Sequence, residues 1–179
     1  MKILIVVDMQ KDFVDGALGT VEAAAIVPAV AEKIRAYRAA GDVVIATRDT
    51  HEENYLSTQE GRFLPVVHCV RGTAGWQLDP AVAEALGPDA EIVDKPTFGS
   101  MELITKVGEY AALVGEENVN VEIVGLCTDI CVVSNALLLK AAWHEMPISL
   151  DPKCCAGVTP QKHDAAIETM RSCQIKILD

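Results

Sequence analysis

The chain has 179 residues, a net charge of −11, and a composition that is 50% hydrophobic but only 4% aromatic. This length allows one domain with a sizeable core, and a core of Val, Ile, Leu and Ala suits a buried parallel sheet covered by helices. No apolar run approaches the roughly 18 residues of a membrane helix, and no Lys/Arg cluster offers a nucleic-acid surface, so we expect neither partner.

The N-terminus and the cysteines favour a cytoplasmic location. The apolar stretch after Lys2 is cut short by Asp8, so we expect no cleaved signal peptide. Without a secretory signal, six cysteines in a chain of this size do not indicate a disulfide framework, and no C-x-x-C motif occurs. Most of the cysteines are expected to be small buried residues.

Apolar β-branched runs and helical repeats alternate along the chain. The first strand is expected at residues 2–7, and a helix at 23–40 follows, with Gly41 as its C-cap. Further strands are expected at 42–47, 90–94, 120–126, 147–150 and 175–178. Further helices are expected at 79–86, 101–113, 128–144 and 160–172, and the helix at 128–144 has Thr128 or Asp129 as its N-cap.

The long segment at residues 48–79 shows little periodicity and is rich in polar residues, His, Gly and Pro. Loops of this length inside compact domains are usually functional. The alternation of strands and helices on either side of it predicts one α/β domain over residues 1–179. Its sheet would be doubly wound (Rossmann-like), six-stranded and mostly parallel, with helices on both faces.

Reactive side chains follow four of the predicted strands, and they are Asp8, Asp49, His51, Lys95 and Cys131. In a parallel sheet these strand ends share one edge, where ligands bind at the point of strand-order reversal. Cys131 lies near the start of a predicted helix. The partial positive charge at a helix N-terminus favours a thiolate, the reactive form of cysteine.

A metal site is predicted from Asp49-x-His51 with His68 downstream. One carboxylate and two imidazoles suit Zn²⁺, Mn²⁺ or Fe²⁺ and leave open positions for water or substrate. The alternative is that Asp49 and His51 form a local hydrogen-bonded turn and bind nothing.

Aromatic residues stand near two of the reactive groups. Phe13 and Phe98 are candidates to sandwich a flat ring, with ordinary core packing as the alternative. Trp76 either walls the same pocket or lies in a surface turn.

The chain resembles the isochorismatase-like cysteine hydrolases, and among them the nicotinamidases most. The resemblance spans nearly the whole chain and is carried by a set of motifs in order: VDMQKDF at 7–13, TRDTH at 47–51, HCVRGT at 68–73, Lys95, and GLCTDICV at 125–132. It implies a catalytic triad of Asp8, Lys95 and Cys131, an oxyanion hole formed by the backbone N–H groups of Cys127 and Cys131, and a cis peptide bond before Cys127.

The resemblance also implies an activity: hydrolysis of nicotinamide to nicotinate and ammonia through a cysteine thioester, as in NAD salvage. The chemistry of the residues agrees, because Cys131 supplies a nucleophile, Asp8 a proton carrier and Lys95 a charge that holds both. A divalent metal, zinc in preference to manganese or iron, would orient the pyridine ring. Glu60 is the candidate fourth ligand, since some family members add one from this loop.

Two alternatives remain at this point. The first is a related cysteine amidohydrolase that acts on another small amide or carbamoyl compound. The second is a non-catalytic metal-binding or redox-sensing protein that uses Cys127 and Cys131. The small apolar chain and the resemblance both favour a homo-oligomer, a dimer or a tetramer.

Overall fold

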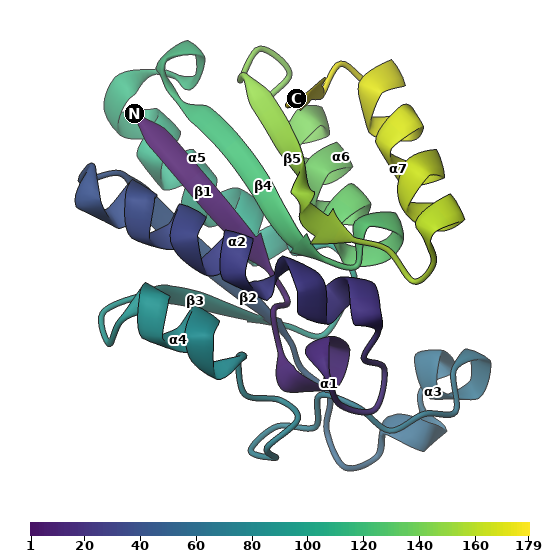
Figure 1. Ribbon diagram of the computed structural model, residues 1–179. Helices are drawn as coiled ribbons and strands as arrows, with labels where there is room; N and C mark the ends of the chain where they lie inside the picture. Colours follow the sequence, from purple (N-terminus) through teal and green to yellow (C-terminus); the bar gives the residue numbers. More distant parts are fainter.

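The computed structural model describes all 179 residues and contains one sheet of six parallel strands (Figure 1). The strand order is β3-β2-β1-β4-β5-β6, so the order reverses between β1 and β4. The strands are β1 (Lys2–Val7), β2 (Val43–Asp49), β3 (Glu91–Lys95), β4 (Asn120–Leu126), β5 (Ile148–Ala156) and β6 (Lys176–Ile177). The predicted doubly wound α/β fold is therefore confirmed, and the sheet is parallel throughout.

Seven α-helices surround the sheet. They are α1 (Lys11–Val14), α2 (Val21–Ala39), α3 (Gln59–Phe63), α4 (Pro80–Leu86), α5 (Met101–Val114), α6 (Val133–Ala142) and α7 (Pro160–Ser172). Helices α2 and α4 cover one face, and α5, α6 and α7 cover the other (Figure 1). None of these helices is long and apolar enough to cross a membrane.

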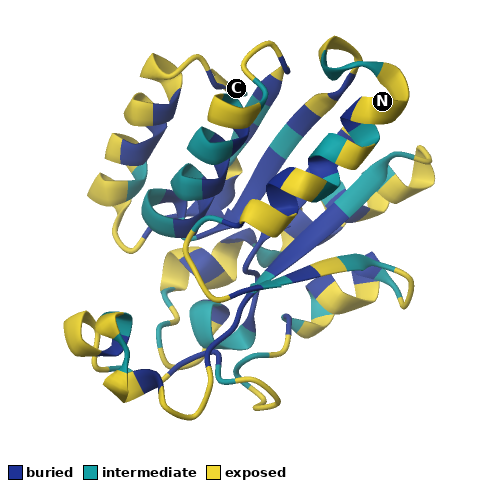
Figure 2. Cartoon of the chain, turned by 180° about the vertical axis from the view of Figure 1, so that it is seen from behind, coloured by how far each residue is buried: buried dark blue, intermediate teal, exposed yellow.

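The alternation of side chains along β1 produces the two halves of the core. Ile3 and Ile5 point into the cluster under α5, α6 and α7, whereas Leu4 and Val6 point into the cluster under α2 and α4. The strand is buried on both faces, as the continuous apolar run predicted (Figure 2). Asp8, which directly follows the last residue of β1, therefore lies in a position without access to solvent.

Local sequence signals set the ends of α2. The Thr20 hydroxyl accepts a hydrogen bond from the Ala23 N–H, so the helix begins slightly before the predicted residue. At the other end Gly41 has a φ of +75°, and its N–H donates to the Arg38 carbonyl while that of Asp42 donates to Tyr37. This Schellman motif confirms Gly41 as the C-terminal stop.

The prediction of one α-helix over 128–144 is wrong. Thr128–Val132 forms a π-helical turn, and the α-helix proper runs only over Val133–Ala142. Neither predicted N-cap acts as one, because the side chain of Thr128 turns toward α7 and that of Asp129 toward the segment that precedes α7. The Thr128 hydroxyl lies 2.8 Å from His163 Nδ1, and Asp129 Oδ1 accepts from the Val158 N–H. Tertiary contacts thus replace a local cap.

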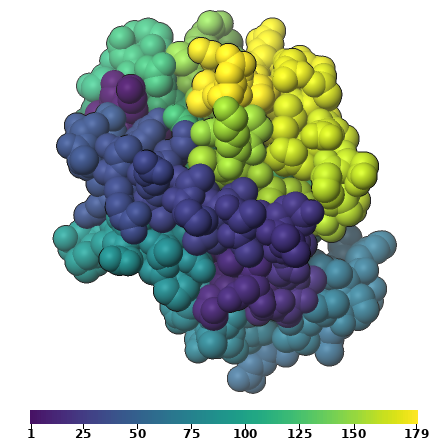
Figure 3. Space-filling view, viewed as in Figure 1, coloured from purple at the N-terminus to yellow at the C-terminus, as the bar shows by residue number.

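Two short helical segments interrupt the long loop, which the sequence did not predict. A 3₁₀ turn at Tyr55–Ser57 leads directly into α3. Their residues still project from the body of the molecule, below α7 in the space-filling view (Figure 3). The loop is therefore partly structured, but it is not part of the sheet layers.

Gly125 allows β1 and β4 to approach where the strand order reverses. Its φ is +117°, and a Cβ there would lie 2.1 Å from the Val7 carbonyl oxygen. Gly41 also has a positive φ, but a Cβ there would meet nothing within 4 Å. A side chain at Gly41 would therefore meet backbone strain alone, whereas a side chain at Gly125 would meet both strain and steric overlap.

We predict that Gly125→Ala lowers the free energy of unfolding by at least about 3 kcal/mol, because strain and overlap add. Gly41→Ala should lose only about 1–2 kcal/mol, the ordinary cost of a left-handed alanine. Urea unfolding of both variants measures the difference. Equal losses would show that the strands can separate to admit a methyl group.

Candidate active site

The end of β1 places Asp8 in an unusual backbone conformation. Its φ is +48°, a conformation that is uncommon for a non-glycine residue, costs roughly 1–3 kcal/mol and clusters at functional sites. The Thr47 carbonyl accepts its N–H at 3.2 Å, and the Thr47 hydroxyl donates to Asp8 Oδ1 at 2.6 Å. Thr47 thus fixes both the backbone and the carboxylate.

Asp8, Lys95 and Cys131 converge at the strand-order reversal. Lys95 Nζ lies 2.6 Å from Asp8 Oδ2 and 3.4 Å from Cys131 Sγ, and it also donates to the Thr97 carbonyl at 3.1 Å. The exposed fractions of the three residues are 0%, 1% and 5%. Residues distant in the sequence therefore share one ammonium in a site without bulk water.

Burial and charge decide the protonation of this cluster. Burial raises the pKa of the Cys131 thiol well above its usual value, and the nearby Asp8 carboxylate raises it further. Burial alone would lower the pKa of Lys95, but Asp8 and Cys131 raise it, so the ammonium stays charged. The expectation of a thiolate favoured by a helix N-terminus is wrong: Cys131 lies within the turn, is buried, and faces a carboxylate.

The turn after β4 also positions Cys127. This residue follows the strand directly, and its backbone N–H has no hydrogen-bond acceptor within the protein. All peptide bonds are trans, so the cis bond expected before Cys127 is absent. The bend is made instead by Gly125 at positive φ and by the π-helical turn, which begins after the extended Cys127.

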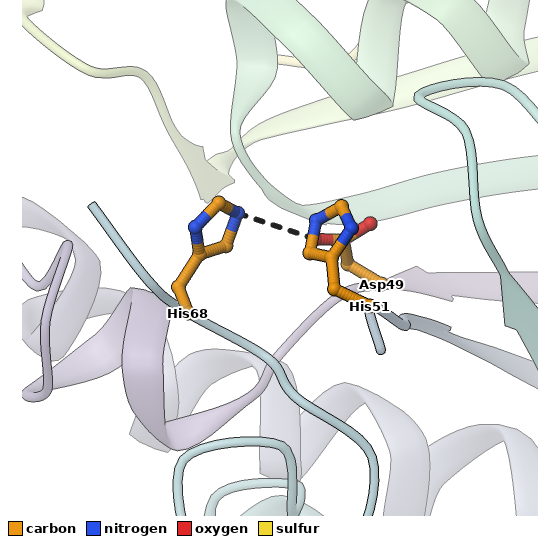
Figure 4. A group of neighbouring side chains, drawn as sticks. All are labelled: Asp49, His51 and His68. Atoms are coloured by element: carbon orange, nitrogen blue, oxygen red, sulfur yellow. Dashed lines mark ion pairs between the residues drawn. The ribbon is translucent and has the colours of Figure 1, made fainter. Parts of the chain in front are cut away.

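Asp49, His51 and His68 form a second cluster beside the first (Figure 4). Their ligand atoms all lie within 4.8 Å of one another, and Asp49 Oδ2 is 3.0 Å from His51 Nε2 and 3.5 Å from His68 Nε2. Glu60 Oε1 lies 3.6 Å and 3.8 Å from the same two nitrogens. The structure thus brings all four predicted ligands to one point.

The donor set fits a divalent cation. His68 Nδ1 lies 2.8 Å from the Val66 carbonyl, so this nitrogen carries a hydrogen and Nε2 is the nitrogen that faces Asp49. His51 Nε2 is buried, and its charged neighbours are the carboxylates of Asp49 at 3.0 Å and Glu60 at 3.6 Å. The 3.0 Å contact between Asp49 and His51 is also the one that a local hydrogen-bonded turn would make, but the approach of His68 and Glu60 to the same atoms goes beyond such a turn and gives a donor set suited to a divalent cation.

Polar residues that the sequence analysis did not select hold these clusters. Gln10 donates to the carbonyls of Asp49 and Trp76, at 2.8 and 2.9 Å, and accepts from the Asp49 N–H at 2.7 Å. Asn135 donates to the Cys131 carbonyl at 2.8 Å and to the Phe98 carbonyl at 3.2 Å. Gln10 stands two residues after Asp8, and both are fully buried. A polar residue so close to the end of a buried strand was the signal in the sequence that could have identified Gln10 as part of the site.

Both clusters open onto one pocket of about 820 Å³. Of Asp8, Lys95 and Cys131, only Cys131 lines it. Cys127 and all four predicted metal ligands line it as well. All three phenylalanines of the chain line the pocket as well, namely Phe13, Phe63 and Phe98. The sequence analysis missed Phe63, which is 86% exposed on α3, because its role depends on where the loop folds.

Trp76, the third aromatic candidate, lies outside this pocket, and so does His144, which was not among the predicted ligands. Trp76 does not line the pocket, and its indole N–H donates to the Thr50 hydroxyl at 2.9 Å. His144 lies beyond the end of α6 with an exposed side chain next to Glu145. All six cysteines are free thiols.

The model of the isochorismatase domain family matches residues 2–179, so the chain belongs to the isochorismatase family. Among similar proteins, the nicotinamidase of Schizosaccharomyces pombe is 25% identical, over 98% of this chain and 91% of that protein. The nicotinamidase/pyrazinamidase of Mycobacterium tuberculosis is 26% identical, over 99% of this chain and 98% of that protein. A crystal structure of Pyrococcus horikoshii pyrazinamidase in complex with zinc is 33% identical, with a TM-score of 0.82 over 99% of this chain and 98% of that one.

We predict that Lys95→Met lowers the free energy of unfolding by about 3–5 kcal/mol, because it leaves the Asp8 carboxylate buried without a counter-charge. The double variant Asp8→Asn/Lys95→Met should recover much of that loss, since it buries no charge. Urea unfolding at neutral pH measures both. A double variant as unstable as Lys95→Met would show that packing of the lysine, and not its charge, is what matters.

Proposed function

We propose that this protein hydrolyses nicotinamide to nicotinate and ammonia through a thioester on Cys131. The coarser assignment rests on the family and on the nicotinamidase and pyrazinamidase relatives: the chain is a hydrolase that acts on amide carbon–nitrogen bonds. One observation supports the finer proposal most directly. The ammonium of Lys95 contacts both the buried carboxylate of Asp8 and the thiol of Cys131, and Cys131 is the one of these three residues that lines the pocket.

The first half of the reaction forms the thioester. Asp8 takes the proton of the Cys131 thiol, and the sulfur attacks the amide carbon, so a negative charge develops on the oxygen. The backbone N–H groups of Cys127 and Cys131 receive that oxygen. Asp8 then gives its proton to the nitrogen, the C–N bond breaks, and ammonia leaves.

The second half regenerates the thiol. Asp8 takes a proton from water as the water oxygen attacks the thioester carbon. The C–S bond then breaks, nicotinic acid leaves and ionises, and the proton returns from Asp8 to Cys131. Lys95 stays protonated throughout, and it stabilises whichever of its two partners is anionic.

Asp49, His51 and His68 would hold a divalent ion, with Glu60 as a further ligand and zinc preferred to manganese or iron. When bound, the ion supplies a Lewis-acid contact for the ring nitrogen and so orients the amide toward the sulfur. Zinc in the Pyrococcus horikoshii relative supports this choice. Phe13 and Phe98 would hold the ring faces, since both line the pocket. The homo-oligomer and the cytoplasmic location stay predictions.

We predict that Cys131→Ala lowers the rate of ammonia release from nicotinamide by at least about 10⁴-fold, because no nucleophile remains. Asp8→Asn should lose about 10²–10⁴-fold in kcat while the substrate still binds, because the proton carrier is removed. A coupled ammonia assay measures turnover, and circular dichroism checks the fold. A folded Cys131→Ala variant with normal turnover would exclude the thioester.

The same assay with a panel of small amides tests the substrate. We expect nicotinamide and pyrazinamide to be turned over with the highest kcat/KM. The pocket of about 820 Å³ exceeds the size of a pyridine ring and leaves room for the alternative, another small amide or carbamoyl compound. A carbamoyl compound preferred by more than about tenfold would replace nicotinamide as the substrate.

We predict that removal of divalent metal with a chelator raises the KM for nicotinamide by about 10–100-fold, because ring orientation is lost, and that added Zn²⁺ restores it. His51→Ala should behave like the chelated protein, whereas His144→Ala, far from the cluster, should not. Elemental analysis gives the metal content. A wild-type protein that is fully active without metal would refute the metal's role.

A further inference from the structure

Two arginines approach the ring of Trp76, which follows the metal-ligand segment around His68 in the sequence. The Arg48 guanidinium carbon is 3.7 Å from the centre of the indole ring, and that of Arg71 is 5.7 Å away. Both distances fall within the range of cation–π attraction. Asp94 binds both arginines, through Arg48 Nε at 2.7 Å and Arg71 Nη1 at 2.9 Å. We call these residues the Trp76 clamp: Arg48, Arg71, Trp76 and Asp94.

The clamp contacts the first ligand segment through Thr50, which stands between Asp49 and His51. The indole N–H donates to the Thr50 hydroxyl at 2.9 Å, and that hydroxyl donates to the Arg48 carbonyl at 3.1 Å. This chain of hydrogen bonds holds the backbone between the two ligands. Trp76 therefore acts on the ligand segment without lining the pocket.

The backbone of Arg71 joins the two ligand segments. The Arg71 backbone N–H donates to the His51 carbonyl at 2.8 Å, and the His51 backbone N–H donates to the carbonyl of Cys69, next to His68, at 2.9 Å. The two segments thus form a short parallel bridge.

The strand register connects the clamp to the site behind it. Arg48 pairs with Asp94, and Asp49 pairs with Lys95, in the parallel ladder of β2 and β3. Successive residues of a strand point to opposite faces, so the ion pair of the clamp lies behind the metal ligand Asp49 and the ammonium of Lys95.

From this geometry we infer that Trp76 is a positioning residue of the metal site, which fixes the orientation of Asp49 and His51 from behind. The inference rests on the proposed metal binding. Groups that orient metal ligands commonly change affinity by about 10–100-fold, and Trp76 adds a stacked, doubly held ring to a hydrogen bond.

Metal affinity of chelator-treated protein tests this directly, by competition of Zn²⁺ with a chromophoric chelator and by the visible spectrum of bound Co²⁺. We expect Trp76→Leu to bind Zn²⁺ about 10–100-fold more weakly and to alter the Co²⁺ spectrum. Trp76→Phe keeps the ring but loses the N–H, so its loss should be smaller. Trp143→Phe is the matched control, because Trp143 packs against the core near α6, and it should stay within about twofold of wild type.

Thr50→Val keeps the test informative if Trp76→Leu fails to fold. It removes the hydroxyl, and with it both the hydrogen bond from the indole N–H and the hydrogen bond to the Arg48 carbonyl, so it should weaken Zn²⁺ binding by at least as much as Trp76→Phe. The double variant Trp76→Phe/Thr50→Val should bind Zn²⁺ no more weakly than Thr50→Val alone, since Thr50→Val already lacks the hydrogen bond that Trp76→Phe removes.

Two results would overturn the inference in different ways. If wild type binds Zn²⁺ but Trp76→Leu and Thr50→Val bind it equally tightly with an unchanged Co²⁺ spectrum, the clamp has no positioning role and the metal site stands. If wild type takes up neither ion, the proposed metal site fails, and the inference fails with it.

Discussion

A carboxylate and an ammonium lie 2.6 Å apart at the centre of this molecule, both without access to solvent. Two charges removed from water are tolerated only when each supplies the other's counter-charge and the remaining polar atoms are bonded. The rest of the site follows from this requirement. Thr47 satisfies Asp8, Thr97 and Cys131 satisfy Lys95, and β1, β2, β3 and β4 must end at one level for these contacts to form.

The strands could be predicted because their signal is local. A parallel strand buried on both faces gives a near-continuous run of apolar residues, and the segments predicted at 2–7 and 120–126 match β1 and β4 residue for residue, although β4 also contains Glu122 and Gly125. Strand ends were less predictable where they depend on pairing with a neighbouring strand. β5 continues to Ala156 through Asp151, Pro152 and Lys153 because β4 lies alongside it and the register shifts between Ile123 and Gly125.

The site residues at strand ends could be placed on one edge of the sheet before any coordinates, because β–α alternation alone fixes that edge. What the sequence could not provide were the positions that depend on loop conformation. Phe63 reaches the pocket only because α3 forms within the long loop, and Gln10 reaches Asp49 only because α1 follows Asp8 so closely. The thiol's high pKa was also missed, since it depends on burial and on the neighbouring carboxylate.

The strand order divides the working parts unevenly along the polypeptide. Everything N-terminal to residue 96 contributes the carboxylates, the imidazoles and the ammonium, on β1, β2, β3 and the loop between the last two. The thiol that contacts Lys95 and lines the pocket, Cys131, comes only with the turn after β4, and β4 inserts beside the first strand. A chain that ended before β4 would therefore bring the carboxylates, the imidazoles and the ammonium together without that thiol and without the strand that completes the level at which they meet.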